Sequence, residues 1–129
     1  ICLWGFAFKA DTGDTRESPA IYIARRLVEE NARVVVSDPR ALENARADLR
    51  DTGADVSYVE DPAEAARGCH ALCVLTEWDL YRHQDFEKIY HSMEKPAFLF
   101  DGRNILDHEM CFDIGFNVYP IGKTPLTHF

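Results

Sequence analysis

The segment from Gly5 to Ala20 holds the side chains whose types and spacing could do chemistry: GFAFKADTGDTRESPA. An apolar run from Ile1 to Phe8 leads into Lys9 and then into a loop rich in Asp, Thr and Gly. Ser18-Pro19 has the residue types that open a helix. Because α/β proteins hold anionic ligands where a strand passes through a polar loop into a helix, the segment predicts an anion-binding loop.

Two cations that are far apart in the sequence could meet at this loop. Lys9 carries a compact charge that can contact phosphate oxygens, and Arg103 offers a planar fork for phosphate or ribose oxygens. Either could instead be an ordinary surface residue, with Arg103 in an ion pair with Asp101 or Asp107. Since parallel strands end at one edge of a sheet, we expect Lys9 and Arg103 to face one ligand there.

Three other residues follow predicted strands, and we interpret them as structural. An acid at the position of Asp38 often binds ribose, but no G-x-G-x-x-G follows the first strand, so Asp38-Pro39 is interpreted as a turn. Glu77 is interpreted as an acid at a helix start, where the helix dipole favours it. Trp78 is expected to pack at a junction between elements or subunits.

Strands and helices alternate along the whole chain. Apolar and β-branched runs predict strands at 1–8, 33–37, 56–59, 71–75, 97–100 and 116–121. Helical spacing and capping residues predict helices at 19–31, 41–50, 62–68 and within 78–93, with one or two turns at 104–111. This alternation implies right-handed crossovers between parallel strands. The sequence therefore predicts a single α/β domain with an open, mostly parallel, Rossmann-like sheet and helices on both faces.

The composition fits one globular domain and excludes some classes of partner. The 129 residues are 47% hydrophobic, enough to bury a core. The net charge of -8 argues against nucleic acid, which needs a broad basic surface, whereas a single nucleotide needs only local cations. No apolar run approaches the roughly 18 residues of a membrane span. The chain opens in an apolar strand without Met or a signal peptide, so we expect a fragment of a longer protein.

The cysteines and histidines indicate no catalytic or metal site. The four cysteines include no C-x-x-C pair, and Cys2 and Cys73 fall in predicted strands, where cysteine is a small apolar residue. Cys69, His70 and Cys73 offer too few ligands for zinc. We therefore expect no catalytic residue and no metal ligand here, and free thiols favour a cytoplasmic setting.

The motif at 5–20 resembles the start of the C-terminal, UDP-binding domain of the UDP-glucose/GDP-mannose dehydrogenase family, in particular its UDP-glucose 6-dehydrogenases. Three shorter segments agree in order: SDP at 37–39, TEW at 76–78 and FDGRN at 100–104. The resemblance therefore covers nearly the whole chain, from Gly5 to about Lys123.

The resemblance implies roles for four residues. Phe8 and Lys9 would hold the UDP part of UDP-glucose, and Arg103 would contact the nucleotide sugar. Arg16 would reach NAD held by the other part of the enzyme. Because Arg16 lies among acidic residues, an ion pair that orders the loop is equally open.

The resemblance also implies that the whole enzyme oxidises UDP-glucose to UDP-glucuronate with two NAD+. The catalytic cysteine and the Gly-rich NAD loop would belong to an N-terminal NAD-binding domain outside this chain. Residues 1–129 would then be the C-terminal UDP-binding domain, inactive by itself, and the enzyme a homo-oligomer without a nucleic-acid or membrane partner.

Two alternatives stay open. The chain could be a stand-alone, non-catalytic nucleotide-binding module. It could also be the equivalent domain of a UDP-N-acetyl-sugar or GDP-mannose dehydrogenase, although the DTGDTRESPA loop favours the UDP-glucose enzyme. A receiver-like switch fits poorly, because it needs paired acids where this chain has Phe8-Lys9.

Overall fold

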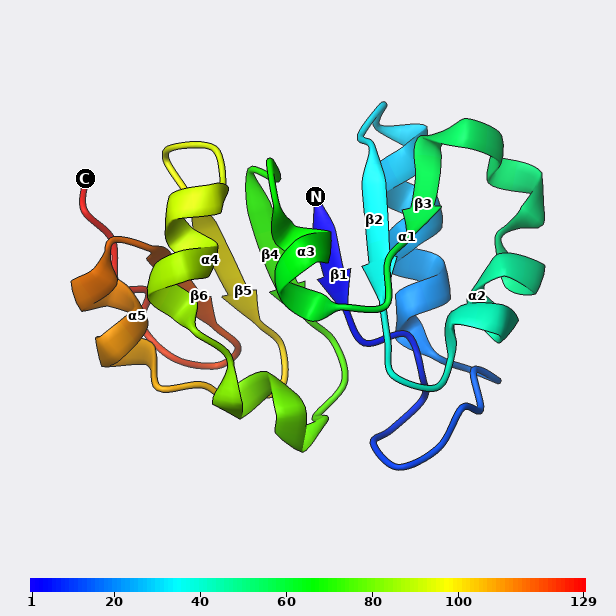
Figure 1. The fold of residues 1–129 in the computed structure, drawn as a ribbon, viewed down its shortest axis with the longest axis horizontal. Helices are drawn as coiled ribbons and strands as arrows, with labels where there is room; N and C mark the ends of the chain where they lie inside the picture. The colour runs from blue at the N-terminus through cyan, green and yellow to red at the C-terminus, as the bar shows by residue number, and fades with distance from the viewer.

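A single open sheet of six parallel strands forms the centre of the molecule. The computed structural model describes all residues 1–129, and the strands follow the order β3-β2-β1-β4-β5-β6 (Figure 1). Their bounds are β1 (Cys2–Trp4), β2 (Val34–Ser37), β3 (Val56–Tyr58), β4 (Ala71–Val74), β5 (Phe98–Asp101) and β6 (Asn117–Pro120). Every neighbouring pair is parallel, which confirms the predicted fold class.

Helices cover both faces of the sheet. They are α1 (Pro19–Glu29), α2 (Leu42–Asp48), α3 (Pro62–Ala66), α4 (Phe86–Ser92) and α5 (His108–Ile114), with 3₁₀ helices η1 (Arg50–Asp55) and η2 (Asp79–His83). In Figure 1, α3 and α4 cross in front of the strands and α1 lies behind β2 and β3. The strand arrows point toward one edge, where the β1–α1 loop and η2 lie. No helix combines the length and the hydropathy that a membrane span requires.

The first strand ends well before the predicted boundary at Phe8. At Gly5 the chain leaves the hydrogen-bonded sheet. Its φ is +97°, a conformation that residues with a Cβ atom rarely adopt. A Cβ atom at Gly5 would also overlap the Thr76 side chain. The amide groups of Phe6 and Ala7 then donate to the Asp38 carboxylate instead of a neighbouring strand. The apolar run therefore continues as a buried, irregular segment.

Capping residues set the helix boundaries. Ser18 is the N-cap of α1, as predicted: its hydroxyl accepts a hydrogen bond from the Ala20 amide and donates one to the Phe6 carbonyl. The predicted helix within 78–93 divides into η2 and α4, because Asp85 caps α4. The last helix begins later than predicted, because Asp107 is its N-cap.

An aromatic cluster fixes the position of η2 and α4 on the sheet. Trp4 is fully buried in β1 and stacks on Tyr81 at 4.9 Å between ring centroids, with Phe86 at 5.9 Å. Its indole Nε1 donates to the Pro62 carbonyl oxygen at 2.9 Å. The segment that follows β4 is thereby held against the carboxyl edge of the sheet.

The close approach at Gly5 generates a stability prediction. Gly5→Ala is expected to lower the free energy of unfolding by about 2–4 kcal/mol, because it adds a strained φ and an overlap with Thr76. Gly122→Ala is the matched control: its φ is also positive, at +71°, but the space around it is open, so a loss of about 1 kcal/mol is expected. Urea unfolding of both variants checks this, and equal losses would contradict it.

Candidate functional site

The Asp38 carboxylate anchors the start of the β1–α1 loop. Asp38 follows β2 and is 1% exposed. Its Oδ2 accepts hydrogen bonds from the amides of Phe6 (2.8 Å) and Ala7 (3.0 Å) and from Trp78 Nε1 (3.2 Å). Its Oδ1 accepts the amides of Arg40 and Ala41, both at 2.8 Å. The predicted turn is present, and the carboxylate faces inward with both oxygens occupied.

Phe8 and Lys9 lie on a short exposed segment that is tied down on both sides. Thr76 Oγ1 donates to the Ala7 carbonyl oxygen at 2.9 Å, and the Ala10 amide donates to Glu77 Oε1 at 2.6 Å. Between these ties the Phe8 side chain is 49% exposed, and the Lys9 side chain is exposed with no hydrogen-bond or ion-pair partner. The fold therefore presents an aromatic ring and an unpaired ammonium group to solvent.

Arg103 lies on the loop that follows β5 and pairs with an acid that neither reading of the sequence named. Its guanidinium forms an ion pair with Glu77, through Nη2 and Oε2, and not with Asp101 or Asp107. Asp101 contributes through the backbone instead, because its Oδ1 accepts the Arg103 amide at 3.1 Å. The alternative of a side-chain pair with Asp101 or Asp107 is not what the structure shows, because both carboxylates accept backbone amides of the β5–α5 segment.

Asp101 orders the loop that carries Arg103, much as Asp38 orders the β1–α1 loop. It is 0% exposed, and its Oδ2 accepts the amides of Ile105 and Leu106, both at 3.0 Å. His108 Nε2 lies 2.8 Å from the same oxygen. The backbone that carries Arg103 is therefore fixed by a buried carboxylate.

Glu77 joins the two candidate loops. One of its oxygens binds the amide that follows Lys9, and the other pairs with Arg103. Lys9 and Arg103 therefore lie on loops that meet at the same carboxyl edge. The interpretation of Glu77 as an acid at a helix start is wrong: η2 begins at Asp79, and Glu77 caps no helix. Trp78 packs at an element junction as expected, since it is buried beside Asp38.

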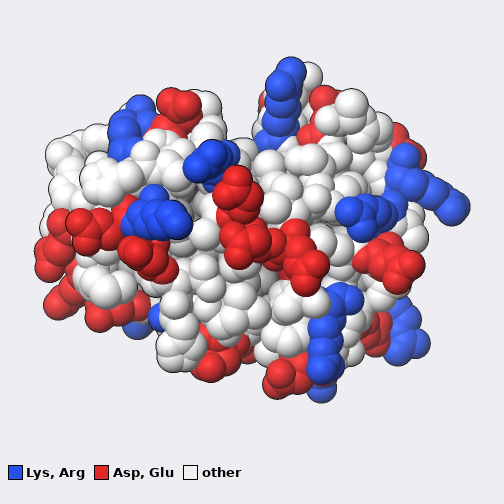
Figure 2. All heavy atoms as spheres, viewed as in Figure 1, with Lys and Arg blue, Asp and Glu red and all other residues white.

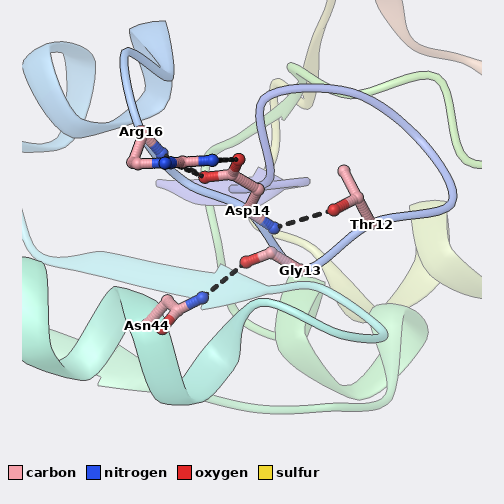
Figure 3. A network of polar contacts seen from close by, with 5 residues as sticks. All are labelled: Thr12, Gly13, Asp14, Arg16 and Asn44. Atoms are coloured by element: carbon pink, nitrogen blue, oxygen red, sulfur yellow. Dashed lines mark hydrogen bonds and ion pairs between the residues drawn. The ribbon is translucent and has the colours of Figure 1, made fainter.

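Arg16 forms the local ion pair that its acidic neighbours indicated (Figure 3). Its Nε and Nη2 donate to the two carboxylate oxygens of Asp14 at 3.0 and 2.7 Å. The Asp14 amide donates to Thr12 Oγ1, and Asn44 Nδ2 of α2 donates to the Gly13 carbonyl oxygen. The Arg16 hydrogen bonds lower the pKa of Asp14 from 3.8 to about 2. The Arg16 side chain is 88% exposed and lies on the outer side of the loop.

These cations do not line the surface hollow that the C-terminal helices form. It has a volume of about 580 Å³ and lies between α4 and α5. Its lining residues are Glu87, His91, Asp107, Glu109, Met110, Asp113 and Ile114. Four of these side chains carry carboxylates, which repel phosphate. Figure 2 shows acidic and basic side chains mixed over the face that carries α3 and α4, so positive charge gathers only locally.

The cysteines contribute packing. Cys2, Cys69 and Cys111 are buried, Cys73 is partly buried, and no disulfide is present. Burial raises the pKa of the Cys111 thiol to about 12. A hydrogen bond with Cys2 lowers the pKa of Cys69, while burial raises that of Cys2. The prediction of a buried, apolar Cys2 is confirmed.

The geometry suits binding rather than bond making. Lys9 offers a point charge, and the Arg103 guanidinium keeps donors beyond the one that Glu77 engages, so both can bind phosphate oxygens. The exposed Phe8 ring offers an apolar surface. Sequence reasoning missed the roles of Thr76 and Glu77 in holding the Lys9 segment, the pairing of Glu77 with Arg103 and the anchoring role of Asp38. Their shared signal is a polar residue directly after an apolar strand run.

The sheet, its strand order and its loop-borne cations define an α/β domain of the Rossmann-like class. A family model described as the UDP-glucose/GDP-mannose dehydrogenase family, UDP binding domain, matches residues 2–108. The chain therefore belongs to this family and corresponds to its UDP binding domain. The resemblance carried by the 5–20 motif is thus confirmed.

Curated relatives and a solved structure agree with this assignment. The chain is 46% identical to UDP-glucose 6-dehydrogenase 1 of Arabidopsis thaliana, over 95% of the chain and 30% of that protein. It is 44% identical to UDP-glucose 6-dehydrogenase 2 of Oryza sativa subsp. japonica, over 100% of the chain and 30% of that protein. A UDP-glucose dehydrogenase structure from Pyrobaculum islandicum gives a TM-score of 0.71 at 34% identity, over 92% of this chain and 24% of that one. The chain thus spans about 30% of the length of these curated relatives.

The anchoring role of Asp38 predicts a large loss of stability in Asp38→Asn. The amide group would turn a donor toward backbone amides that now donate to Asp38, so we expect the free energy of unfolding to fall by about 2–4 kcal/mol. Asp79→Asn is the control, because Asp79 forms only exposed pairs with Arg82 and His83, and a change within about 0.5 kcal/mol is expected. Chemical denaturation measures both, and similar small losses would contradict the anchoring role.

The Arg16–Asp14 pair predicts a pH dependence confined to acid. Because the pKa of Asp14 is lowered, the pair contributes fully to the stability of the loop above pH 3.8. This contribution is lost as the pH falls toward about 2. NMR titration of the Asp14 carboxyl carbon should show this low midpoint, and Arg16→Gln should return it toward 3.8. A midpoint that is the same in both proteins would show that the pair does not persist in solution.

Proposed function

We propose that this chain is the C-terminal UDP-sugar-binding domain of a longer UDP-glucose 6-dehydrogenase. The whole enzyme would oxidise UDP-glucose to UDP-glucuronate with two NAD+. The observation that carries the proposal is the meeting of the Lys9 and Arg103 loops at one edge of the sheet, joined by Glu77. Membership of the family and relatives named UDP-glucose 6-dehydrogenase support it.

Three side chains would bind the nucleotide part of the substrate. The Lys9 ammonium group would contact the diphosphate as a point charge, and the Arg103 guanidinium would donate to phosphate or sugar oxygens. The Phe8 ring would pack against the uridine. The exposure of all three side chains supports these roles. We assign no catalytic residue and no metal ligand to the chain.

The residues of this chain do not form a dinucleotide site of their own. No Gly-rich loop follows β1, and the acid after β2, Asp38, is buried with both oxygens occupied. We therefore propose that NAD, which accepts the hydride, is held mainly by an N-terminal NAD-binding domain of the same protein. Arg16 would contact it from across the domain interface, which its exposed position on the loop allows.

The setting of the whole protein is part of the proposal. We place it in the cytoplasm as a homo-oligomer, with UDP-glucose as its substrate and the N-terminal domain as the intramolecular partner of this chain. The equivalent domain of another nucleotide-sugar dehydrogenase is the second candidate. The identity of 46% and 44% to relatives named for UDP-glucose favours the first.

Substitution of the two cations tests the proposal. In the full-length protein, Lys9→Ala and Arg103→Ala are each expected to weaken UDP-glucose binding by about 1–3 kcal/mol, because each removes a charge-assisted hydrogen bond. Lys88→Ala and Arg50→Ala are matched controls, because both side chains are exposed and make no hydrogen bond or ion pair. Isothermal titration calorimetry measures the affinities. Unchanged affinity in both site variants would discard the proposed site.

A further inference from the structure

Glu77 makes two contacts that connect distant parts of the chain. Its Oε1 accepts the Ala10 amide at 2.6 Å across a sequence separation of 67 residues. Its Oε2 pairs with Arg103, which lies 26 residues further along. The Glu77 side chain is 31% exposed, so solvent screens this pair only in part. One carboxylate thus determines how the segment after Lys9 lies relative to the Arg103 guanidinium.

Arg103 depends on this contact for its orientation. An arginine side chain populates many rotamers, and it loses part of that freedom when it binds a ligand. The buried Asp101 fixes the backbone of Arg103, but Glu77 is the only residue that hydrogen-bonds its guanidinium. Glu77 engages Nη2 and leaves Nε and Nη1 without a partner. Those donors are available to a phosphate group while the ion pair persists.

Two roles can be distinguished for an acid in this position. Glu77 could position Arg103 for the ligand, or it could act as a counter-ion that the ligand must displace. Displacement would require the carboxylate to move away. The residues on both sides oppose this, because Thr76 donates to the Ala7 carbonyl oxygen and Trp78 donates to the buried Asp38. The second Glu77 oxygen is also held by the Ala10 amide.

We propose that Glu77 is a positioning residue that holds Arg103 and the Lys9 segment in the arrangement that binds the diphosphate of the substrate. The inference rests on the function proposed above and adds a residue to it. Glu77 does not touch the ligand: it carries the same charge sign as phosphate, and it acts through the guanidinium. Its effect on binding must therefore depend on the presence of Arg103.

A double-mutant cycle in the full-length protein, with UDP as the probe, tests this dependence. Glu77→Gln keeps an oxygen for the Ala10 amide but removes the charge that holds Arg103. We expect it to bind UDP about tenfold more weakly than the parent protein, the scale of one charge-assisted contact. In an Arg103→Ala background the same change is expected to cause less than about a twofold further loss, because the partner is gone.

Steady-state kinetics and a control separate positioning from general damage. Glu77→Gln should raise KM for UDP-glucose by a similar factor and change kcat by less than about twofold, because the effect lies in binding. Asp79→Asn, which removes exposed pairs in the next turn, should leave UDP affinity unchanged. If Glu77→Gln unfolds at a lower temperature than the parent protein, Glu77→Asp provides a second variant. It keeps the charge but has a shorter side chain, and we expect a comparable loss of UDP affinity.

Each other outcome overturns the inference in a recognisable way. Equal UDP affinity of Glu77→Gln and the parent protein would exclude positioning. Tighter binding would identify Glu77 as a counter-ion that competes with the ligand. An equal loss with and without Arg103 would assign the effect to the loop in general. If the parent protein does not bind UDP, the proposed function fails, and this inference fails with it.

Discussion

The site depends on one buried charge, the carboxylate of Asp38. A carboxylate removed from water is costly unless hydrogen bonds compensate it, and Asp38 is 1% exposed. Its compensation comes from five N–H groups, in the loop after β1, in the turn before α2 and in the indole of Trp78. All of these segments must be in place together for the charge to be tolerated. The path of the β1–α1 loop is therefore set by the need to provide hydrogen bonds to this buried carboxylate.

The same solution recurs across the sheet at Asp101. This carboxylate, at the end of β5, accepts the amides of three residues in the following loop and lies beside the His108 ring. Buried acids thus fix the two loops that carry exposed cations, Lys9 and Arg103. The cations are left free for a ligand because the acids near them in space are occupied with backbone amides. Glu77 is the exception, since it spans both loops and engages one edge of the guanidinium.

This arrangement reconciles an acidic protein with the anion-binding edge that we propose. The chain carries a net charge of -8, yet binding a nucleotide requires only that a few cations face outward at one place. Acids that form N-caps or accept loop amides, such as Asp61, Asp85 and Asp107, have structural partners of their own. In our proposal the domain presents one side of a ligand site, and the rest of that site belongs to the longer protein, since the chain spans about 30% of the length of a curated relative.

The sequence by itself determined the alternation of strands and helices, the parallel sheet, the start of α1 at Ser18-Pro19 and the family. These follow from local signals. Apolar runs, capping residues and the long 5–20 motif can each be recognised from residues that are close together in the sequence. Only the tertiary structure decided that β1 ends at Trp4, that Glu77 is the partner of Arg103 and that Asp38 anchors a loop. Each of these depends on contacts between residues 26 to 40 positions apart. The register of the strands and the paths of the loops select such partners, and no local pattern of residues encodes them.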